Sequence, residues 1–80
     1  MASKKLEKGS ADWQFFQDFW KFRQEYYEPE EKDEWFDELI KVAELLRKKY
    51  ENTEVKVLAK DLIVAHLEDV DRRSRNEQGN

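Results

Sequence analysis

The stretch from Trp13 to Tyr27, WQFFQDFWKFRQEYY, decides the fold, because its aromatic residues recur at the spacing of an α-helix. At about 100° per residue they fall on two neighbouring lines along the same half of the helix. One line holds Trp13, Phe16, Trp20 and Tyr27, and the other holds Phe15, Phe19, Phe22 and Tyr26. The remaining half carries glutamine and charged residues, so the pattern predicts an amphipathic helix with an aromatic half.

The residues on either side of this stretch mark where the helix begins and ends. Ser10 can cap the amino end, because a serine hydroxyl accepts a hydrogen bond from an unpaired backbone N–H. Pro29 lacks a backbone N–H and disfavours helical geometry in the residue before it. We therefore predict a helix over about 11–28.

A second amphipathic segment follows at about 33–51. Its apolar residues keep the spacing of one helix face, and they are Trp35, Phe36, Leu39, Val42, Ala43, Leu46 and Tyr50. Acidic residues open the segment, with Asp33 as the candidate N-cap, and basic residues close it, as the helix dipole favours.

The third predicted helix covers about 54–72, after a turn in which Asn52 adopts the left-handed conformation and Thr53 caps the new helix. The residues expected to be buried are Val55, Leu58, Ala59, Leu62, Ile63, Ala65, His66 and Val70. Residues 54–57 alternate in polarity like a strand, but the helical pattern is far longer.

Three amphipathic helices with short connections predict an all-α fold, a three-helix antiparallel bundle. A chain of 80 residues has room for one core, which we place in a single domain over residues 10–72. The polar segments 1–9 and 73–80 are predicted to be disordered tails. With no cysteine and no Cys/His cluster, neither a disulfide nor a zinc ion supports the core, so the aromatic residues must.

The composition also restricts location and partners. No apolar run is long enough to cross a bilayer, and no apolar segment follows the lysines at the amino end as it would in a secretory signal. The absence of cysteine fits a reducing compartment, so we expect a cytoplasmic protein without membrane contact. The net charge of −4 argues against a nucleic acid as its main partner.

His66 is the single histidine and lies on the apolar side of the third predicted helix. A histidine-activated nucleophile needs a serine or cysteine beside it, yet Ser3, Ser10 and Ser74 lie in the tails or at a cap. We therefore expect a structural histidine, no cofactor and no enzymatic activity. Because the reference pKa of histidine is close to physiological pH, His66 could still act as a pH switch.

The stretch from Glu28 to Glu38 has seven carboxylates and one lysine, a net charge of −6, so the rest of the chain carries +2. A cation site, a docking surface for a basic partner and a solvated helix start all fit this charge. The spacing lacks the alternating ligands and central glycine of a calcium loop, so we predict no metal site.

Basic clusters near the two ends of the chain suggest an alternative function, that of a nucleic-acid-associated accessory protein. The clusters are Lys4, Lys5 and Lys8, and Arg72, Arg73 and Arg75. Neither cluster has aromatic residues nearby that could stack on bases. The polar positions of the third helix carry a net charge of −3, which DNA would repel.

Several residues do not fit a single core and suggest a surface for another protein. Leu45 lies off the apolar stripe of its helix, and Val57 and Val64 share a line opposite the buried side of theirs. Trp13 belongs to an aromatic half that two neighbours cannot fully cover. Arg23 lies between the aromatic lines, where its guanidinium can lie over a ring. We expect an interaction module that binds an unknown protein partner, or a second copy, either through exposed rings or through the line of Val57 and Val64, with these five residues as the candidates.

The segments WQFFQDFW at 13–20, YYEP at 26–29, DEWFDEL at 33–39 and KY at 49–50 resemble small uncharacterised proteins of phage-like and mobile elements in Gram-positive bacteria. The resemblance covers residues 13–50 and consists of a pattern of rings and acids, not of a chemical motif. It implies a small accessory protein of unassigned function and supplies no catalytic residue.

Overall fold

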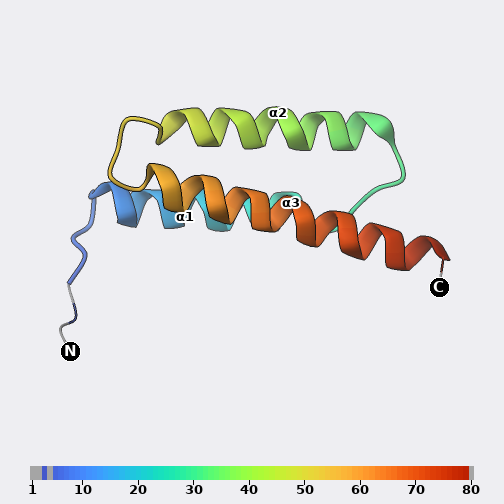
Figure 1. Cartoon of the computed structure of the whole chain (residues 1–80), viewed down its shortest axis with the longest axis horizontal. Coiled ribbons are helices and arrows are strands. Elements are labelled where there is room, and N and C mark those ends of the chain that lie inside the picture. Colours follow the sequence, from blue (N-terminus) through green and yellow to red (C-terminus); the bar gives the residue numbers. More distant parts are fainter. Residues whose placement is uncertain (1–2, 4, 80) are drawn as a thin grey trace.

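The computed structural model describes Ser3 and residues 5–79 of the chain, which form three helices (Figure 1). They are α1 (Ala11–Glu25), α2 (Asp33–Lys49) and α3 (Lys56–Gly79). Each helix packs against the other two, and α2 runs antiparallel to both α1 and α3. The prediction of an all-α three-helix bundle is confirmed. None of the helices in the described residues has the length and apolar character that crossing a membrane requires.

The core lies between the three helices and uses one of the two aromatic lines of α1. Phe15, Phe22 and Tyr26 on this line are buried, whereas Phe16 and Trp20 on the other line are 45% and 63% exposed. The buried aliphatic residues come from α2, α3 and the turn between them, and they are Leu39, Ala43, Leu46, Val55, Ala59, Ile63 and Val70. The aromatic core of α1 therefore packs against an aliphatic core from the rest of the chain.

The beginning of α1 matches the prediction, but its end does not. The hydroxyl of Ser10 accepts from the backbone N–H of Trp13 at 3.2 Å, which confirms the N-cap. The helix ends at Glu25 instead of about Glu28, because the buried Tyr26 leaves it to pack on α2. The Tyr26 ring lies 5.9 Å from Trp35, and its hydroxyl donates to a carboxylate of α2 at 3.1 Å.

The next helix, α2, begins at the predicted residue without the predicted cap. Lys32 takes the N-cap position and makes no side-chain hydrogen bond to the helix, so Asp33 is the first helical residue and not the cap. Acidic side chains still occupy the first turn and basic ones the last, which suits the helix dipole. The end at Lys49 is close to the predicted 51.

The turn before α3 is held by Thr53. Its hydroxyl donates to the carbonyl of Tyr50 at 2.8 Å and accepts from the N–H of Val55 at 3.3 Å, as expected for a capping residue. The left-handed conformation predicted for Asn52 is wrong, since Gly9 alone has a positive φ among the described residues. Several backbone N–H groups instead donate to the carbonyl three residues earlier and close this turn, including that of Thr53 to Tyr50 at 3.2 Å.

The last helix, α3, is longer than predicted, because it continues from residue 72 to Gly79. Residues 73–79, which the sequence assigned to a disordered tail, extend the helix, while Asn80 lies outside the described residues. Ion pairs one turn apart stabilise this extension: Arg73 with Asp69 at 3.1 Å and Arg75 with Asp71 at 3.2 Å. The charges that favoured a solvated tail therefore also support a helix.

A polar contact fixes the rotation of α1 against α2. The carboxylate of Asp18 accepts from the Tyr50 hydroxyl at 2.5 Å and from the ammonium of Lys49 at 2.7 Å. The Tyr50 ring is buried and meets Phe15 edge-on, with 5.3 Å between the ring centroids. Burial and the neighbouring carboxylate both raise the pKa of Tyr50, so the phenol stays protonated and keeps donating. The aromatic line that contains Phe15 is thereby turned into the core.

The difference between the two aromatic lines gives a test with a matched control. Replacing the fully buried ring in Phe15→Ala leaves a cavity and should lower the free energy of unfolding by about 3–5 kcal/mol. The neighbouring change Phe16→Ala removes the same atoms from an exposed site and should cost about 1 kcal/mol or less. Urea unfolding followed by circular dichroism in dilute solution measures both, and equal losses would contradict the assignment of the core.

Candidate interaction surface

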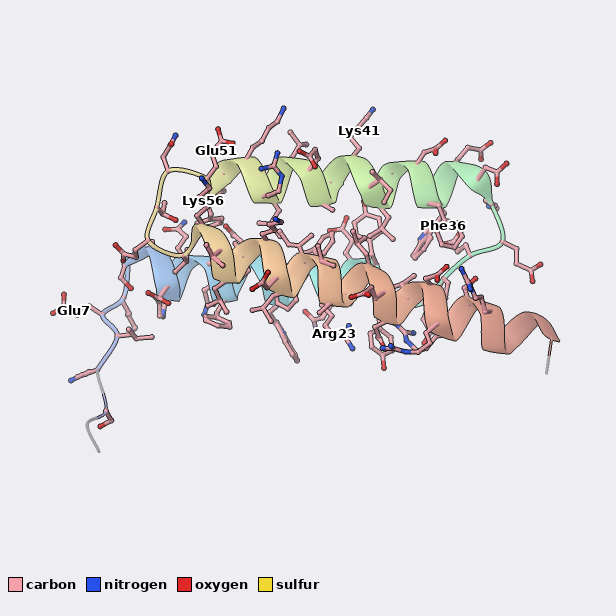
Figure 2. The ribbon with its side chains drawn as sticks, viewed as in Figure 1. Glu7, Arg23, Phe36, Lys41, Glu51 and Lys56 are labelled. Carbon is pink, nitrogen blue, oxygen red and sulfur yellow. The ribbon has the colours of Figure 1, made fainter. Side chains whose placement is uncertain are left out.

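The contacts of Arg23 show which sides of α1 and α3 face each other. Its Nη1 donates to Nδ1 of His66 at 2.9 Å, and its Nη2 donates to Oδ2 of Asp69 at 3.2 Å. The ring of Phe19 packs edge-on against the His66 ring, with centroids 6.4 Å apart. Arg23 lies on the side of this helix pair that is away from α2 (Figure 2).

Apolar residues gather on the same side of the pair, and we call them the α1–α3 face. The members are Trp13, Phe16 and Trp20 of α1, and Leu58, Leu62 and Ala65 of α3. At the spacing of a helix, Trp13, Phe16 and Trp20 project from α1 on the far side of Arg23 from α2. Between the helices the face has a shallow hollow of about 250 Å³, whose apolar lining is Phe19, Leu62 and Ala65.

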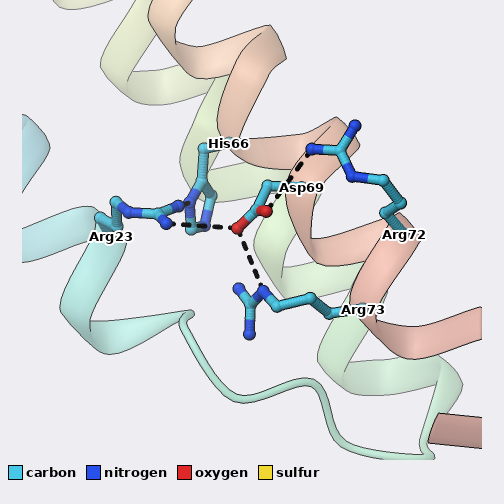
Figure 3. A network of polar contacts seen from close by, with 5 residues as sticks. All are labelled: Arg23, His66, Asp69, Arg72 and Arg73. Atoms are coloured by element: carbon cyan, nitrogen blue, oxygen red, sulfur yellow. Dashed lines mark hydrogen bonds and ion pairs between the residues drawn. The ribbon is translucent and has the colours of Figure 1, made fainter. Parts of the chain in front are cut away.

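One end of the α1–α3 face is a polar cluster centred on the carboxylate of Asp69 (Figure 3). Besides Arg23, this carboxylate pairs with Nε of Arg73 at 3.1 Å and with Nη2 of Arg72 at 3.5 Å. Hydrogen bonds from Arg23 and Arg73 outweigh the opposing effect of burial, so the pKa of Asp69 lies below its usual value. Three guanidiniums surround one carboxylate, which gives the cluster a net charge of +2 while His66 is neutral.

Two of these guanidiniums lie against the ring of Tyr27. The guanidinium carbon of Arg73 is 4.1 Å from the ring centroid, and that of Arg23 is 5.1 Å from it. The sequence predicted that the guanidinium of Arg23 would lie over a ring, and this contact is present. The contact with Arg73 adds a cation–π attraction between α3 and the segment that follows α1, whereas the contact with Arg23 lies within that part of the chain.

His66 is the buried polar residue of the core, with 1% of its surface exposed. Because a guanidinium donates hydrogen bonds and accepts none, Nδ1 must be the acceptor for Arg23 and the ring proton must lie on Nε2. Nε2 has no hydrogen-bond partner among the described residues. Burial, and then the charge of Arg23, lower the pKa of His66, so the ring stays neutral in the folded protein.

The five residues that the sequence suggested as a surface do not form one patch. Trp13 is a member of the α1–α3 face, and Arg23 lies in the polar cluster at one end of this face. Leu45 is 63% exposed and borders a different groove, between α1 and α2. Val57 and Val64 are 68% and 43% exposed, on the side of α3 opposite its buried residues.

Two members of the face, Leu58 and Ala65, were expected in the core but are exposed. Phe16 and Trp20 belong to the aromatic line that stays exposed, and Leu58 of α3 is 40% exposed. The prediction that Ala65 is buried is also wrong, because helical spacing turns Ala65 farther from the buried Ile63 than Leu62 is. The number of rings on α1 signalled that some would remain uncovered, but it did not show which.

The acidic stretch lies elsewhere, where α1 passes into α2. A hollow of about 370 Å³ is lined there by Tyr26, Trp35 and the charged residues Glu25, Glu30, Lys32, Glu34 and Glu38. Among the described residues, no three histidine, cysteine, aspartate or glutamate side chains are arranged to hold a metal ion. Docking of a basic partner at this stretch stays a prediction.

Comparison with known proteins adds no relative to this geometry: no protein-family model, no curated protein and no solved structure matches the chain.

The lowered pKa of His66 predicts how stability depends on pH. The unfolded chain binds a proton near the ordinary value of 6.5, whereas the folded ring stays neutral to lower pH. The free energy of unfolding should therefore fall as pH drops below about 6.5, by at most about 1.4 kcal/mol per pH unit for one proton. In His66→Gln, whose amide oxygen can still accept from Arg23, this slope should disappear. Urea titrations between pH 8 and pH 5 compare the two proteins, and an unchanged slope would assign the effect to other groups.

Proposed function

We propose that this protein is a non-enzymatic interaction module that binds another protein molecule through the α1–α3 face. The observation that carries the proposal is the exposure of Trp20, at 63%, next to Phe16 at 45%. Single exposed apolar residues are common on monomers, but adjacent large rings beside the apolar edge of a second helix mark interaction sites. Tryptophan is also among the residues that contribute most to binding when a partner covers them.

The rigidity of the bundle supports the same function. Trp20 and Phe16 lie on the helix that the Asp18–Tyr50 contact holds to α2 and the Arg23–Asp69 contact holds to α3. A surface on packed helices loses little conformational freedom when a partner binds. The rings are thus presented in a fixed arrangement, as an efficient docking surface requires.

A non-enzymatic role is also favoured by the state of the polar groups nearest the hollow in the face. Arg23, His66 and Asp69 are bonded to one another, and the buried imidazole is kept neutral. Groups engaged in this way hold the helices together and are not directed at a substrate. The proposal includes a cytoplasmic location, which the lack of cysteine favours, and the accessory role implied by the resemblance to proteins of mobile elements.

The nucleic-acid alternative has less support. Arg72, Arg73 and Arg75 all pair with carboxylates of their own helix, at 3.1–3.5 Å. The three guanidiniums lie beside two carboxylates, Asp69 and Asp71, so together they offer phosphate groups a net charge of only +1. We therefore do not propose this function.

Site-specific photo-crosslinking tests the proposed face. A photoreactive phenylalanine analogue placed at position 20 should give a discrete crosslinked product in cells that naturally make the protein. The same analogue at position 57 is the matched control, since Val57 is 68% exposed on another side of α3. A product at position 20 that is absent at position 57, and that is lost when Phe16→Lys is added, is expected. Equal crosslinking at both positions, or none at position 20, would contradict the proposal.

A further inference from the structure

We infer that the α1–α3 face binds a second copy of this chain, in an antiparallel arrangement about a two-fold axis. The inference rests on the proposed docking role of this face and names the occupant. The charges at the two ends of the face, the spacing of the rings between them and the size of the surface all support a second copy as the occupant.

The two ends of the face carry opposite charges. At the end where α1 begins, Asp12 and Glu54 line one hollow together with Glu7 and Lys5. At the other end lie Arg23 and Arg72, whose side chains are 33% and 69% exposed. Because α1 and α3 run in the same direction (Figure 1), Asp12 and Glu54 share one end of the face, and Arg23 and Arg72 share the other.

The acidic and basic residues of α1 have the same midpoint along the bundle axis as those of the α3 side. On α1, Asp12 and Arg23 have their midpoint between residues 17 and 18, and on α3, Glu54 and Arg72 have theirs at residue 63. The contacts of His66 with Phe19 and Phe22 bring residues 62–64 of α3 level with this part of α1. A single two-fold axis at this level, perpendicular to the helices, therefore relates both pairs.

An antiparallel dimer about this axis pairs unlike charges. It places α1 against α1 and α3 against α3 of the two copies, so that Glu54 faces Arg72 of the second copy and Asp12 faces Arg23. The midpoint of Phe16 and Trp20, at residue 18, lies within half a residue of the same axis, so Phe16 of each copy comes close to Trp20 of the other. A parallel dimer would instead bring Asp12 to Glu54 and Arg23 to Arg72, where like charges repel.

The size of the face suits a weak, reversible dimer. From Glu54 to Arg72 it is about 27 Å long at 1.5 Å per residue, and it is two helices, or about 20 Å, wide. Each copy thus offers about 500 Å², which lies near the lower limit for a specific interface. We expect association in the micromolar range.

Sedimentation equilibrium over a series of micromolar concentrations tests the inference on the purified full-length chain. The average mass should rise from that of one chain to that of two. Trp20→Lys should weaken the dimer at least about tenfold, while the equally exposed control Val57→Lys should leave it unchanged. Circular dichroism of each variant confirms that the helices are intact. A monomer at every concentration, or a dimer indifferent to Trp20→Lys, would overturn the inference.

Charge exchange tests the antiparallel arrangement. Glu54→Arg and Arg72→Glu should each weaken the dimer severalfold, and the double variant should restore it, because each new arginine then faces a new glutamate. In a parallel dimer, Glu54 faces Asp12 of the second copy, so Glu54→Arg alone would strengthen association and refute the arrangement.

The two proposals fail differently. If position 20 crosslinks to another protein while the purified chain remains monomeric, the self-association inference is wrong and the interaction module stands. If position 20 gives no product in cells and the purified chain is monomeric, both are wrong.

Discussion

The aromatic residues of α1 cover a wider arc than its two neighbours can bury, and the rest of the structure follows from this constraint. A helix in a three-helix bundle presents only part of its circumference to the other two. The line through Phe15, Phe22 and Tyr26 fills that part. The adjacent line with Phe16 and Trp20 must remain at the surface, so the core is complete without the most exposed rings. Those rings are surplus to folding, and this is why we assign them to binding.

The polar cluster at Asp69 decides where this surplus surface lies. Apolar cores tolerate repacking with some loss of a unique arrangement, whereas a hydrogen bond to a buried group requires both partners to lie in defined positions. Arg23 bonds simultaneously to the buried His66 and to Asp69 of α3, which fixes both the level and the rotation of the two helices. A leucine at position 66 would fill similar space but would leave Nη1 of Arg23 without its acceptor. The histidine is therefore a structural residue with a specific role in aligning α1 and α3.

The fold could be predicted because its signals are local, whereas the surface depends on contacts between distant residues. Ser10, Pro29 and Thr53 act on their own neighbours, and the apolar spacing of each helix needs no partner to be recognised. The errors lie where tertiary contacts dominate, as when Tyr26 leaves α1 to pack on α2. Which aromatic line is buried is set by the rotation of α1. That rotation is fixed by Asp18 with Tyr50, 32 residues away, and by Arg23 with Asp69, 46 residues away. No pattern within α1 contains this information.

The two ends of the α1–α3 face differ in charge, which the overall composition of the chain does not show. The chain is acidic overall, with a net charge of −4, yet one end of the α1–α3 face carries three guanidiniums around a single carboxylate. Apolar rings contribute affinity in either orientation of a partner along the face, whereas charges at the edge of an interface favour one orientation. Because Asp12 and Glu54 lie at the opposite end, the face is polarised along the helices. A partner bound to these rings meets complementary charges in only one of its two possible directions along the α1–α3 face. The rings therefore determine where the partner binds, and the charges at the two ends determine its direction.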